Sequence, residues 1–278
     1  MNRIIAALAA TAALALAIGG GAAWNKYLRT PSVELQPMPA HLIALDSAAG
    51  QKLLARAEAT ADFDALMTHF VPQTRRAFCG VASALTTLNA ARTTPTPLDQ
   101  SRLFEHAAVR MHPLKVSVIG MSLDDFAALL RAHGARVTAV YASASSIDEF
   151  RDAVRANLAN EGDFLLVNYQ RSEVGQAPMG HISPIAAYDE QSDRVLVLDV
   201  AAHKYPPTWI DNRNHVERDA RAAQPADENH ARLSGHARRR RRPRCAECRR
   251  DAGQRGLIAR ASSPQSRKRL ASPDTRCA

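Results

Sequence analysis

The sequence predicts an α+β fold, with helices in the first half of the chain and an antiparallel sheet in the second half. Between residues 46 and 158, apolar residues recur at helical spacing behind Ser and Asp residues that can cap helices. Between residues 164 and 200, three short apolar runs are separated by polar or Gly-containing segments. Helices that precede neighbouring strands in this way are typical of α+β domains.

Residues 1–30 predict an export segment. Arg3 precedes a stretch from Ile4 to Trp24 that contains no charged residue. The apolar part up to Ile18 has the length of a signal-peptide core, whereas the whole uncharged stretch is just long enough to span a bilayer. We therefore expect a bacterial protein that is exported to the periplasm or anchored in the inner membrane, with membrane contact through these residues in the second case.

The predicted catalytic domain covers residues 31–210 and begins with an extended linker. Residues 30–40 contain three prolines, which favour extended backbone. Asp46 and Ser47 can cap a helix that runs to about Ala57, and a second helical stretch covers residues 63–67.

Cys79 is predicted to lie at the N-terminus of the next helix. Four apolar residues after it fall at i, i+3, i+4 and i+7, namely Val81, Ala84, Leu85 and Leu88. The unpaired N–H groups and the positive dipole end of a helix N-terminus favour a thiolate. Cys79 is also the only cysteine before position 245. Taken alone, it would more often be a buried structural thiol, but two distant residues, His181 and Asp199, favour the interpretation of Cys79 as a nucleophile.

Two capping boxes predict the remaining helices. Ser122 and Asp125 have capping-box spacing ahead of a helix that Gly134 can stop. Ser146 and Glu149 repeat that spacing ahead of a second helix.

The predicted strands lie between and after these helices. Residues 137–141 alternate in hydropathy, and residues 164–169 are apolar enough for an interior strand. Residues 179–188 and 194–200 form a predicted hairpin around the polar segment 189–193.

The register of this hairpin would bring a base and a carboxylate together. If the turn centres on Glu190, paired residue numbers sum to 380, so His181 lies opposite Asp199. Opposed residues have Cβ atoms roughly 4.5–5.5 Å apart, close enough for a carboxylate to fix the imidazole tautomer. A shift of one residue would place the two side chains on opposite faces, so the prediction depends on the register.

Three motifs in this order resemble the phytochelatin synthase family, most closely its bacterial one-domain form, over about residues 42–209. The motifs are Phe78-Cys79-Gly80-Val81-Ala82-Ser83, Gly180-His181-Ile182-Ser183-Pro184 and Asp199-Val200-Ala201 followed by Lys204-Tyr205-Pro206-Pro207. The resemblance implies a papain-like cysteine protease fold with a Cys79–His181–Asp199 triad. It also implies that Gln73 belongs to the oxyanion hole and that Gly180 and Ile182 contact substrate.

The activity that this resemblance implies is that of a glutathione γ-glutamylcysteinyltransferase. His181 takes the proton of Cys79, the thiolate attacks an amide carbonyl, and protonated His181 expels the amine. In the family the substrate is glutathione, the amine is glycine, and the acyl-enzyme carries γ-glutamylcysteine. A second glutathione as acceptor gives a phytochelatin, and water gives hydrolysis.

The resemblance implies no protein-bound cofactor or catalytic metal. Heavy-metal ions such as cadmium or zinc would enter as glutathione thiolate complexes, which are partners together with glutathione itself. One departure concerns Ala202 and His203, which stand where the family usually has an arginine and an aromatic residue. The missing arginine makes peptide synthesis less expected than hydrolysis, and we expect His203 to be a solvated loop residue.

Residues 211–278 predict a basic, disordered tail. They hold 18 of the 36 Lys and Arg residues but only 8 of the 27 Asp and Glu residues, which accounts for the whole net charge of +9. Large apolar residues are few and aromatic residues are absent, so folding could not offset the ordering entropy. The family has a helix and a closing strand here, so we expect an incomplete fold and interpret Arg238–Arg242 as a sign of a shifted reading frame.

Other functions of the tail are disfavoured. Nucleic-acid binding is not expected, because the basic residues have no interleaved aromatic residues and the other terminus predicts export. Cys245 and Cys248 have metal-ligand spacing, but His236 and Cys277 do not make a convincing second pair. Two alternatives to the transferase stay open: an inactive or unstable product of a disrupted gene, and a general papain-like peptidase. The sequence indicates no particular oligomeric state.

Overall fold

A computed structural model describes residues 2–91, 96–213 and 257–262, with the backbone alone for residues 2–9 and 257–262. The α+β class is confirmed. The helices are α1 (Asn2–Tyr27), α2 (Ala48–Arg56), α3 (Phe63–Thr68), α4 (Cys79–Ala90), α5 (Arg102–Glu105), α6 (Pro113–Ile119), α7 (Leu123–Ala132) and α8 (Ile147–Leu158), with short 3₁₀ turns η1 (Ala142–Ala144) and η2 (Arg171–Val174). The strands are β1 (Ile43–Ala44), β2 (Arg136–Tyr141), β3 (Asp163–Gln170), β4 (Gly180–Asp189), β5 (Arg194–Val197), β6 (Thr208–Asp211) and β7 (Leu257–Ser262).

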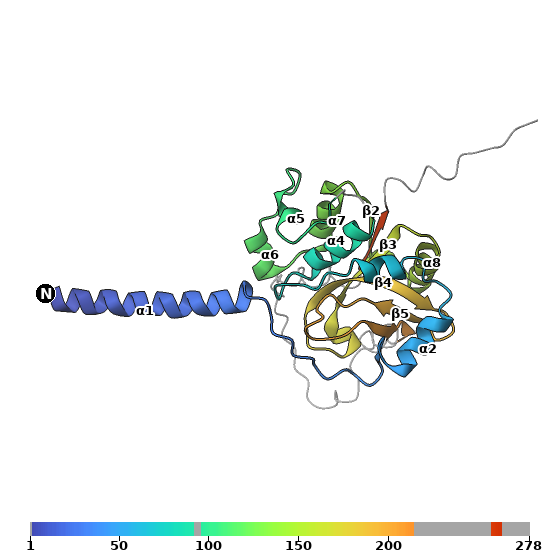
Figure 1. The fold of residues 1–278 in the computed structure, drawn as a ribbon, viewed down its shortest axis with the longest axis horizontal. Coiled ribbons are helices and arrows are strands. Elements are labelled where there is room, and N and C mark those ends of the chain that lie inside the picture. The colour runs from blue at the N-terminus through green and yellow to red at the C-terminus, as the bar shows by residue number, and fades with distance from the viewer. Residues whose placement is uncertain (1, 92–95, 214–256, 263–278) are drawn as a thin grey trace, which may run out of the picture.

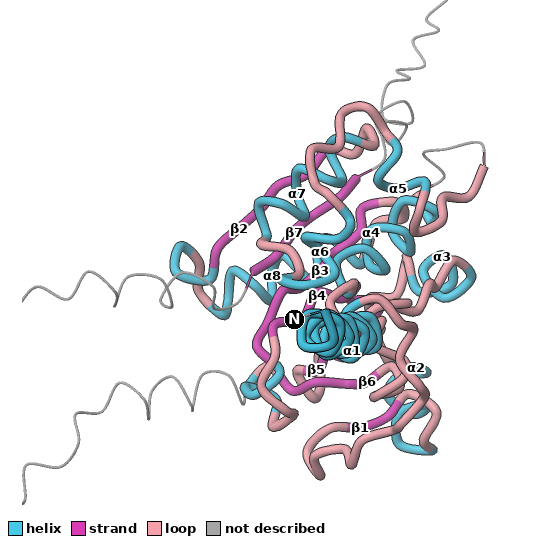
Figure 2. Tube along the Cα trace, turned by 90° about the vertical axis from the view of Figure 1, so that its left-hand side faces the viewer, coloured by secondary structure: helices cyan, strands magenta, loops and turns pink. Residues whose placement is uncertain are grey.

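The described strands form one sheet in the order β1-β6-β5-β4-β3-β7-β2, in which every neighbouring pair is antiparallel. Figure 2 shows this order, with β2 near the top and β1 near the bottom. Successive side chains of a strand point to opposite faces. Accordingly, Leu166 of β3 packs in a core with α4 and α7, and Leu165 packs in a core with α8. β3 is thus the interior strand that its sequence predicts.

Helix α1 extends away from the rest of the described chain (Figure 1). Several of its apolar side chains are exposed, including Leu16 and Ile18. Of the helices whose side chains the structure describes, none has both the length and the hydropathy to cross a bilayer.

The predicted caps are formed as expected. The Ser47 side chain accepts a hydrogen bond from the Gly50 backbone N–H at the start of α2. Both capping boxes, at α7 and α8, are closed in both directions by their Ser and acidic residues. Gly134, which ends α7, has a φ of 85°, a conformation that glycine adopts without strain.

The linker of residues 30–40 also forms backbone hydrogen bonds with the loop that follows Asp199. The Glu34 N–H donates to the carbonyl of His203, and the Gln36 N–H donates to the carbonyl of Lys204, each at 2.9 Å. The linker therefore fastens the loop that follows Asp199.

The predicted register of the hairpin is wrong. Near the turn Asp189 pairs with Arg194 and Tyr188 with Val195, and the register shifts once more between Ile185 and Ala187. The turn covers residues 190–193, which is longer than a turn centred on Glu190. β5 ends at Val197, so Asp199 lies beyond the ladder rather than opposite His181.

The prediction of disorder after residue 210 is wrong for the residues that the structure describes there. β6 includes Asp211, and residues 257–262 form β7 between β3 and β2. Without β7, both neighbours would have an unpaired backbone edge, and pairing with β7 satisfies the N–H and C=O groups along both. The expectation that no further strand follows residue 211 is also wrong, because β7 pairs with both β3 and β2. The rest of the predicted tail, including Arg238–Arg242 and the three tail cysteines, lies outside the described residues.

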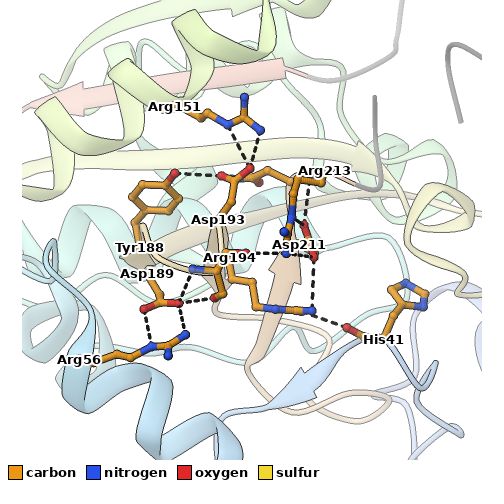
Figure 3. A network of polar contacts seen from close by, with 11 residues as sticks. His41, Arg56, Arg151, Tyr188, Asp189, Asp193, Arg194, Asp211 and Arg213 are labelled. Atoms are coloured by element: carbon orange, nitrogen blue, oxygen red, sulfur yellow. Dashed lines mark hydrogen bonds and ion pairs between the residues drawn. The ribbon is translucent and has the colours of Figure 1, made fainter. Parts of the chain in front are cut away.

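Charged residues fasten the β4–β5 turn to its neighbours (Figure 3). The fully buried Asp189 carboxylate accepts two hydrogen bonds from Arg56 of α2, each at 2.7 Å. Asp193, with a φ of 52°, accepts from the Tyr188 hydroxyl at 2.9 Å and from the Asn212 amide at 3.0 Å, and it pairs with Arg151 of α8. The turn is therefore held by α2, α8 and the segment after β6.

Asp189→Asn is expected to lower the urea midpoint of unfolding by roughly 0.5–1 M, because it neutralises a buried carboxylate that accepts two hydrogen bonds from the partly exposed Arg56. The matched control is Asp152→Asn, which removes the exposed partner of Arg155 on α8 and should change the midpoint very little. Equal midpoints for the two variants would contradict a stabilising role for this network.

Asp62 is a buried carboxyl with incomplete hydrogen bonding. Its Oδ1 accepts from the Gly162 N–H at 2.7 Å, and its Oδ2 has no partner among the described residues. Burial, opposed by the Gly162 hydrogen bond and assisted by the charges of Asp163 and Glu161, raises the pKa of Asp62 to about 6. Asp62 is therefore expected to make the stability of the fold depend on pH.

The pKa of Asp62 lies above its ordinary value of 3.8, so the protonated carboxyl stabilises the fold below pH 4, and this contribution is lost as the pH rises through 6. We expect Asp62→Asn to match the wild type at pH 4 and to exceed its unfolding free energy by about 2–3 kcal/mol above pH 6. Urea unfolding between pH 4 and 7.5 measures this, with Asp64→Asn, at an exposed position of α3, as the control. A difference that does not change with pH would contradict the assignment.

Candidate active site

Cys79 is the first residue of α4, as the sequence predicts. Phe78 precedes it without a side-chain cap, so the first N–H groups of the helix remain available to an anion. Nearly all of α4 is buried, beyond the single face that its apolar spacing predicts. The Ser83 hydroxyl donates to the carbonyl of Ile182 at 2.8 Å, which fixes the start of α4 against β4 beside His181.

Cys79 and His181 are in contact and favour each other's charged forms. Burial by itself raises the pKa of the Cys79 thiol, but a hydrogen bond to His181, the charge of His181 and the N–H groups of Ile182 and Gly80 together lower it. Burial and the charge of Arg171 lower the pKa of the His181 imidazole, but the charge of Asp199 and the hydrogen bonds to Asp199 and Cys79 together outweigh them, and the net shift is upward. Each group therefore shifts the other toward a thiolate–imidazolium pair.

His181 and Asp199 are in contact although the predicted register is wrong. His181 Nε2 lies 2.8 Å from Asp199 Oδ1, and both side chains are buried. After β5 ends, the Leu198 N–H donates to the carbonyl of Pro184 at 2.9 Å and keeps the chain beside β4. The carboxylate thus reaches the imidazole from the segment after the strand.

Arg171 belongs to the site although no motif in the sequence indicates it. Its side chain is buried, and its Nη2 lies 2.8 Å from Asp199 Oδ1. Its Nη1 donates to the Gln176 side chain, and its guanidinium lies 5.1 Å from the centre of the Tyr205 ring. Burial raises the pKa of Asp199, but His181 and Arg171 hold it well below its usual range. Arg171 therefore positions Asp199 and keeps it ionised.

Tyr169 forms one wall around the imidazole. It pairs with His181 across β3 and β4, and the two rings meet edge to face with centroids 5.7 Å apart. Burial and the nearby charge of Asp199 raise the pKa of the Tyr169 hydroxyl. The ring is therefore a neutral neighbour of the Cys79–His181 pair.

Gln73 lies beside the same loop. Its backbone N–H donates to the carbonyl of Val200 at 2.9 Å, and its side-chain amide donates to the carbonyl of Arg76 at 3.0 Å. The Gln73 Oε1 atom is buried and has no hydrogen-bond partner among the described residues. The amide nitrogen keeps a second hydrogen that could be donated to another acceptor. The oxyanion-hole role of Gln73 stays a prediction.

The two predicted substrate contacts differ in exposure. Gly180 is exposed at the start of β4. The Ile182 side chain is buried in the core, 3.4 Å from where a side chain on Gly80 would begin. The backbone N–H of Ile182 is hydrogen-bonded to the Cys79 thiol. Contacts of either residue with substrate stay predictions.

His203 is buried rather than solvated, which corrects the prediction for this residue. Its backbone accepts the hydrogen bond from the linker, so the loop is covered instead of open. Burial and the charge of Lys204 lower the pKa of its imidazole. Burial and the charges of Arg171 and Arg76 in turn lower the pKa of Lys204, so cationic side chains gather on the Asp199 side of the site.

In the part of the chain that the structure describes, no three His, Cys, Asp or Glu side chains are arranged to hold a metal ion.

Comparison with known proteins places these residues in one family. A family model described as phytochelatin synthase matches residues 33–232. A glutathione gamma-glutamylcysteinyltransferase of Lotus japonicus is 36% identical over 152 residues, which are 53% of this chain and 32% of that protein. The corresponding figures are 35%, 53% and 31% for an enzyme of that name from Arabidopsis thaliana, and 27% over 181 residues, 63% and 44% for one from Schizosaccharomyces pombe. The chain thus spans about a third of the length of the first two relatives.

Proposed function

Because the chain belongs to the phytochelatin synthase family, we propose that it transfers the γ-glutamylcysteinyl group of glutathione through Cys79. The observation that carries this proposal is the continuous contact from Cys79 to His181 and from His181 to Asp199. The relatives that bear the name of this activity are much longer than the matched segment. The proposal therefore depends on the chemistry of this site as well as on the family.

The proposal includes a papain-like fold for the domain. Two features support it: the nucleophile is the first residue of a buried helix, and the base lies on a neighbouring strand of an antiparallel sheet. This arrangement lets the helix N-terminus and the imidazole act on the same sulfur.

In the first half-reaction, the Cys79 thiolate attacks the carbonyl carbon of the cysteinyl–glycine amide. An S–C bond forms, and the C–N bond breaks when His181 gives its proton to the glycine nitrogen. Asp199 keeps the charged imidazole in place, and Arg171 keeps Asp199 ionised. The products are free glycine and a thioester on Cys79.

The negative charge that develops on the carbonyl oxygen must be stabilised by hydrogen-bond donors. The Cys79 backbone N–H at the start of α4 and the second amide hydrogen of Gln73 are the groups we assign to this role. The Gln73 side chain is suited to it because its bond to Arg76 and the bond from its backbone to Val200 fix its position.

The second half-reaction uses water or another glutathione to release the acyl group. The cationic side chains Arg76 and Lys204 suit a substrate that carries carboxylates. Ala202, however, provides no positive charge where the family usually has an arginine. We therefore propose that hydrolysis exceeds phytochelatin synthesis, and that cadmium or zinc enters as a glutathione thiolate complex when synthesis occurs.

The proposed location is outside the cytoplasm, with residues 1–30 as the export segment. The exposed apolar side chains of α1, which find no core in the described domain, support this. Fractionation of cells that express the full chain tests it, because the proposal predicts periplasmic or membrane-bound protein.

The direct test of the activity is glycine release from glutathione by the full-length purified protein. The matched control substrate is the α-linked peptide Glu-Cys-Gly, which has the same atoms but a different first linkage. Release from glutathione alone supports a γ-glutamyl pocket, whereas equal release from both substrates indicates a general peptidase. A folded protein that releases glycine from neither would contradict the proposal and favour an inactive gene product.

A further inference from the structure

Ser183 makes a contact with His181 that the three triad residues do not explain. It follows His181 by two residues on β4 and is fully buried. Its hydroxyl oxygen lies 2.8 Å from His181 Nε2. The same nitrogen lies 2.8 Å from Asp199 Oδ1. One ring nitrogen therefore faces two oxygen atoms at hydrogen-bond distance.

The chemistry of these groups fixes the direction of both bonds. Asp199 is ionised and can only accept, so His181 Nε2 must carry the hydrogen that lies between them. The Ser183 oxygen is then a second acceptor for that hydrogen. It also accepts from the Val200 N–H at 3.3 Å, so both of its lone pairs are used. With Nε2 protonated, Nδ1 is the nitrogen left to act on Cys79.

We propose that Ser183 is a positioning residue whose hydroxyl oxygen, together with Asp199, holds the Nε2–H of His181. This second acceptor keeps Nδ1 directed at the Cys79 thiol and stabilises the imidazolium form. Because Ser183 also accepts from the Val200 N–H, it links the imidazole to the backbone next to Asp199. The inference rests on the proposed function in one respect, which is that the Cys79–His181 pair does the chemistry.

Removal of the hydroxyl should have a signature that loss of packing would not produce. With one acceptor fewer, the imidazolium gives up its proton at lower pH. Iodoacetate is an anion, so its reaction with Cys79 is fastest while the imidazolium is present and slows as that group deprotonates. The alkaline limb of the pH–rate profile for alkylation therefore reports the protonation state of His181 without any need for glutathione.

The experiment measures the rate of iodoacetate alkylation on the Cys79 peptide of the full chain between pH 4 and 10. Ser183→Ala is expected to move the alkaline limb to lower pH by roughly half a unit to one unit, and Ser183→Thr, which keeps the oxygen, should restore it. Ser117→Ala is the matched control, because Ser117 is also buried and hydrogen-bonded: its hydroxyl donates to the carbonyl of Pro113 on α6 and accepts from Arg75 in the segment before α4. It should leave the limb where it is in the wild type.

An unshifted limb in Ser183→Ala, whether or not the rate falls at every pH, would overturn the inference and leave Ser183 with a packing role. If Ser183→Ala does not fold, Ser183→Cys fills nearly the same space with a weaker acceptor. Its limb must then still move to lower pH, and an unmoved limb contradicts the inference. A shifted limb in a protein that releases no glycine from glutathione would instead contradict the proposed function and support the role of Ser183.

Discussion

Replacing Cys79 by serine is expected to reduce glycine release from glutathione by roughly 10⁴-fold or more. A serine hydroxyl does not ionise near neutral pH, so no thiolate–imidazolium pair can form with His181. The side chain is smaller only by the difference between sulfur and oxygen, and the fold should survive. Steady-state kinetics measure the loss, and circular dichroism checks the fold.

The matched control for this variant is the same change at the other three cysteines, Cys245, Cys248 and Cys277. A triple Cys→Ser variant at these positions should keep the wild-type rate. The assignment of Cys79 as nucleophile fails if its serine variant keeps the rate and the triple variant loses it.

Asp199→Asn is expected to lower kcat by roughly 10²- to 10⁴-fold while changing KM little. The neutral amide cannot stabilise the imidazolium, and its N–H₂ group can turn toward His181 Nε2 and favour the wrong tautomer. The change also leaves the buried Arg171 without its carboxylate, so some loss of stability should accompany the loss of rate.

Asp189→Asn separates these two effects, because Asp189 is another buried carboxylate paired with an arginine but lies at the far end of the hairpin. It should cost stability and leave kcat close to that of the wild type. An unchanged kcat in Asp199→Asn, measured on folded protein, would contradict the orienting role of Asp199.

Features that depend on neighbouring residues could be predicted from the sequence. The capping boxes at Ser122 and Ser146 are closed by partners three residues away, so the spacing alone contains the information. The position of Cys79 at the first turn of α4 follows in the same way from the apolar spacing behind it.

Features that depend on tertiary contacts could not be predicted from the sequence. The predicted hairpin register is wrong because Asp193 adopts a left-handed conformation and closes a longer turn than the sequence suggests. The His181–Asp199 contact forms all the same, through a segment beyond the ladder. Arg171 is distant in sequence from Asp199, and no local pattern identifies an arginine as the buried partner of a carboxylate. The segment that forms β7 is only six residues long and lies within a basic stretch whose overall composition is typical of disorder.

The most direct test of the central claim is the mass of the Cys79 peptide after the full-length protein is mixed with glutathione and stopped with acid. Acyl transfer through Cys79 predicts a thioester-linked γ-glutamylcysteinyl group on this residue, formed as one equivalent of glycine is released. Glutathione labelled in its glycine distinguishes this product from a mixed disulfide, which would keep the label. Glycine release without an adduct on Cys79, or labelled glutathione bound there intact, would contradict acyl transfer through this residue.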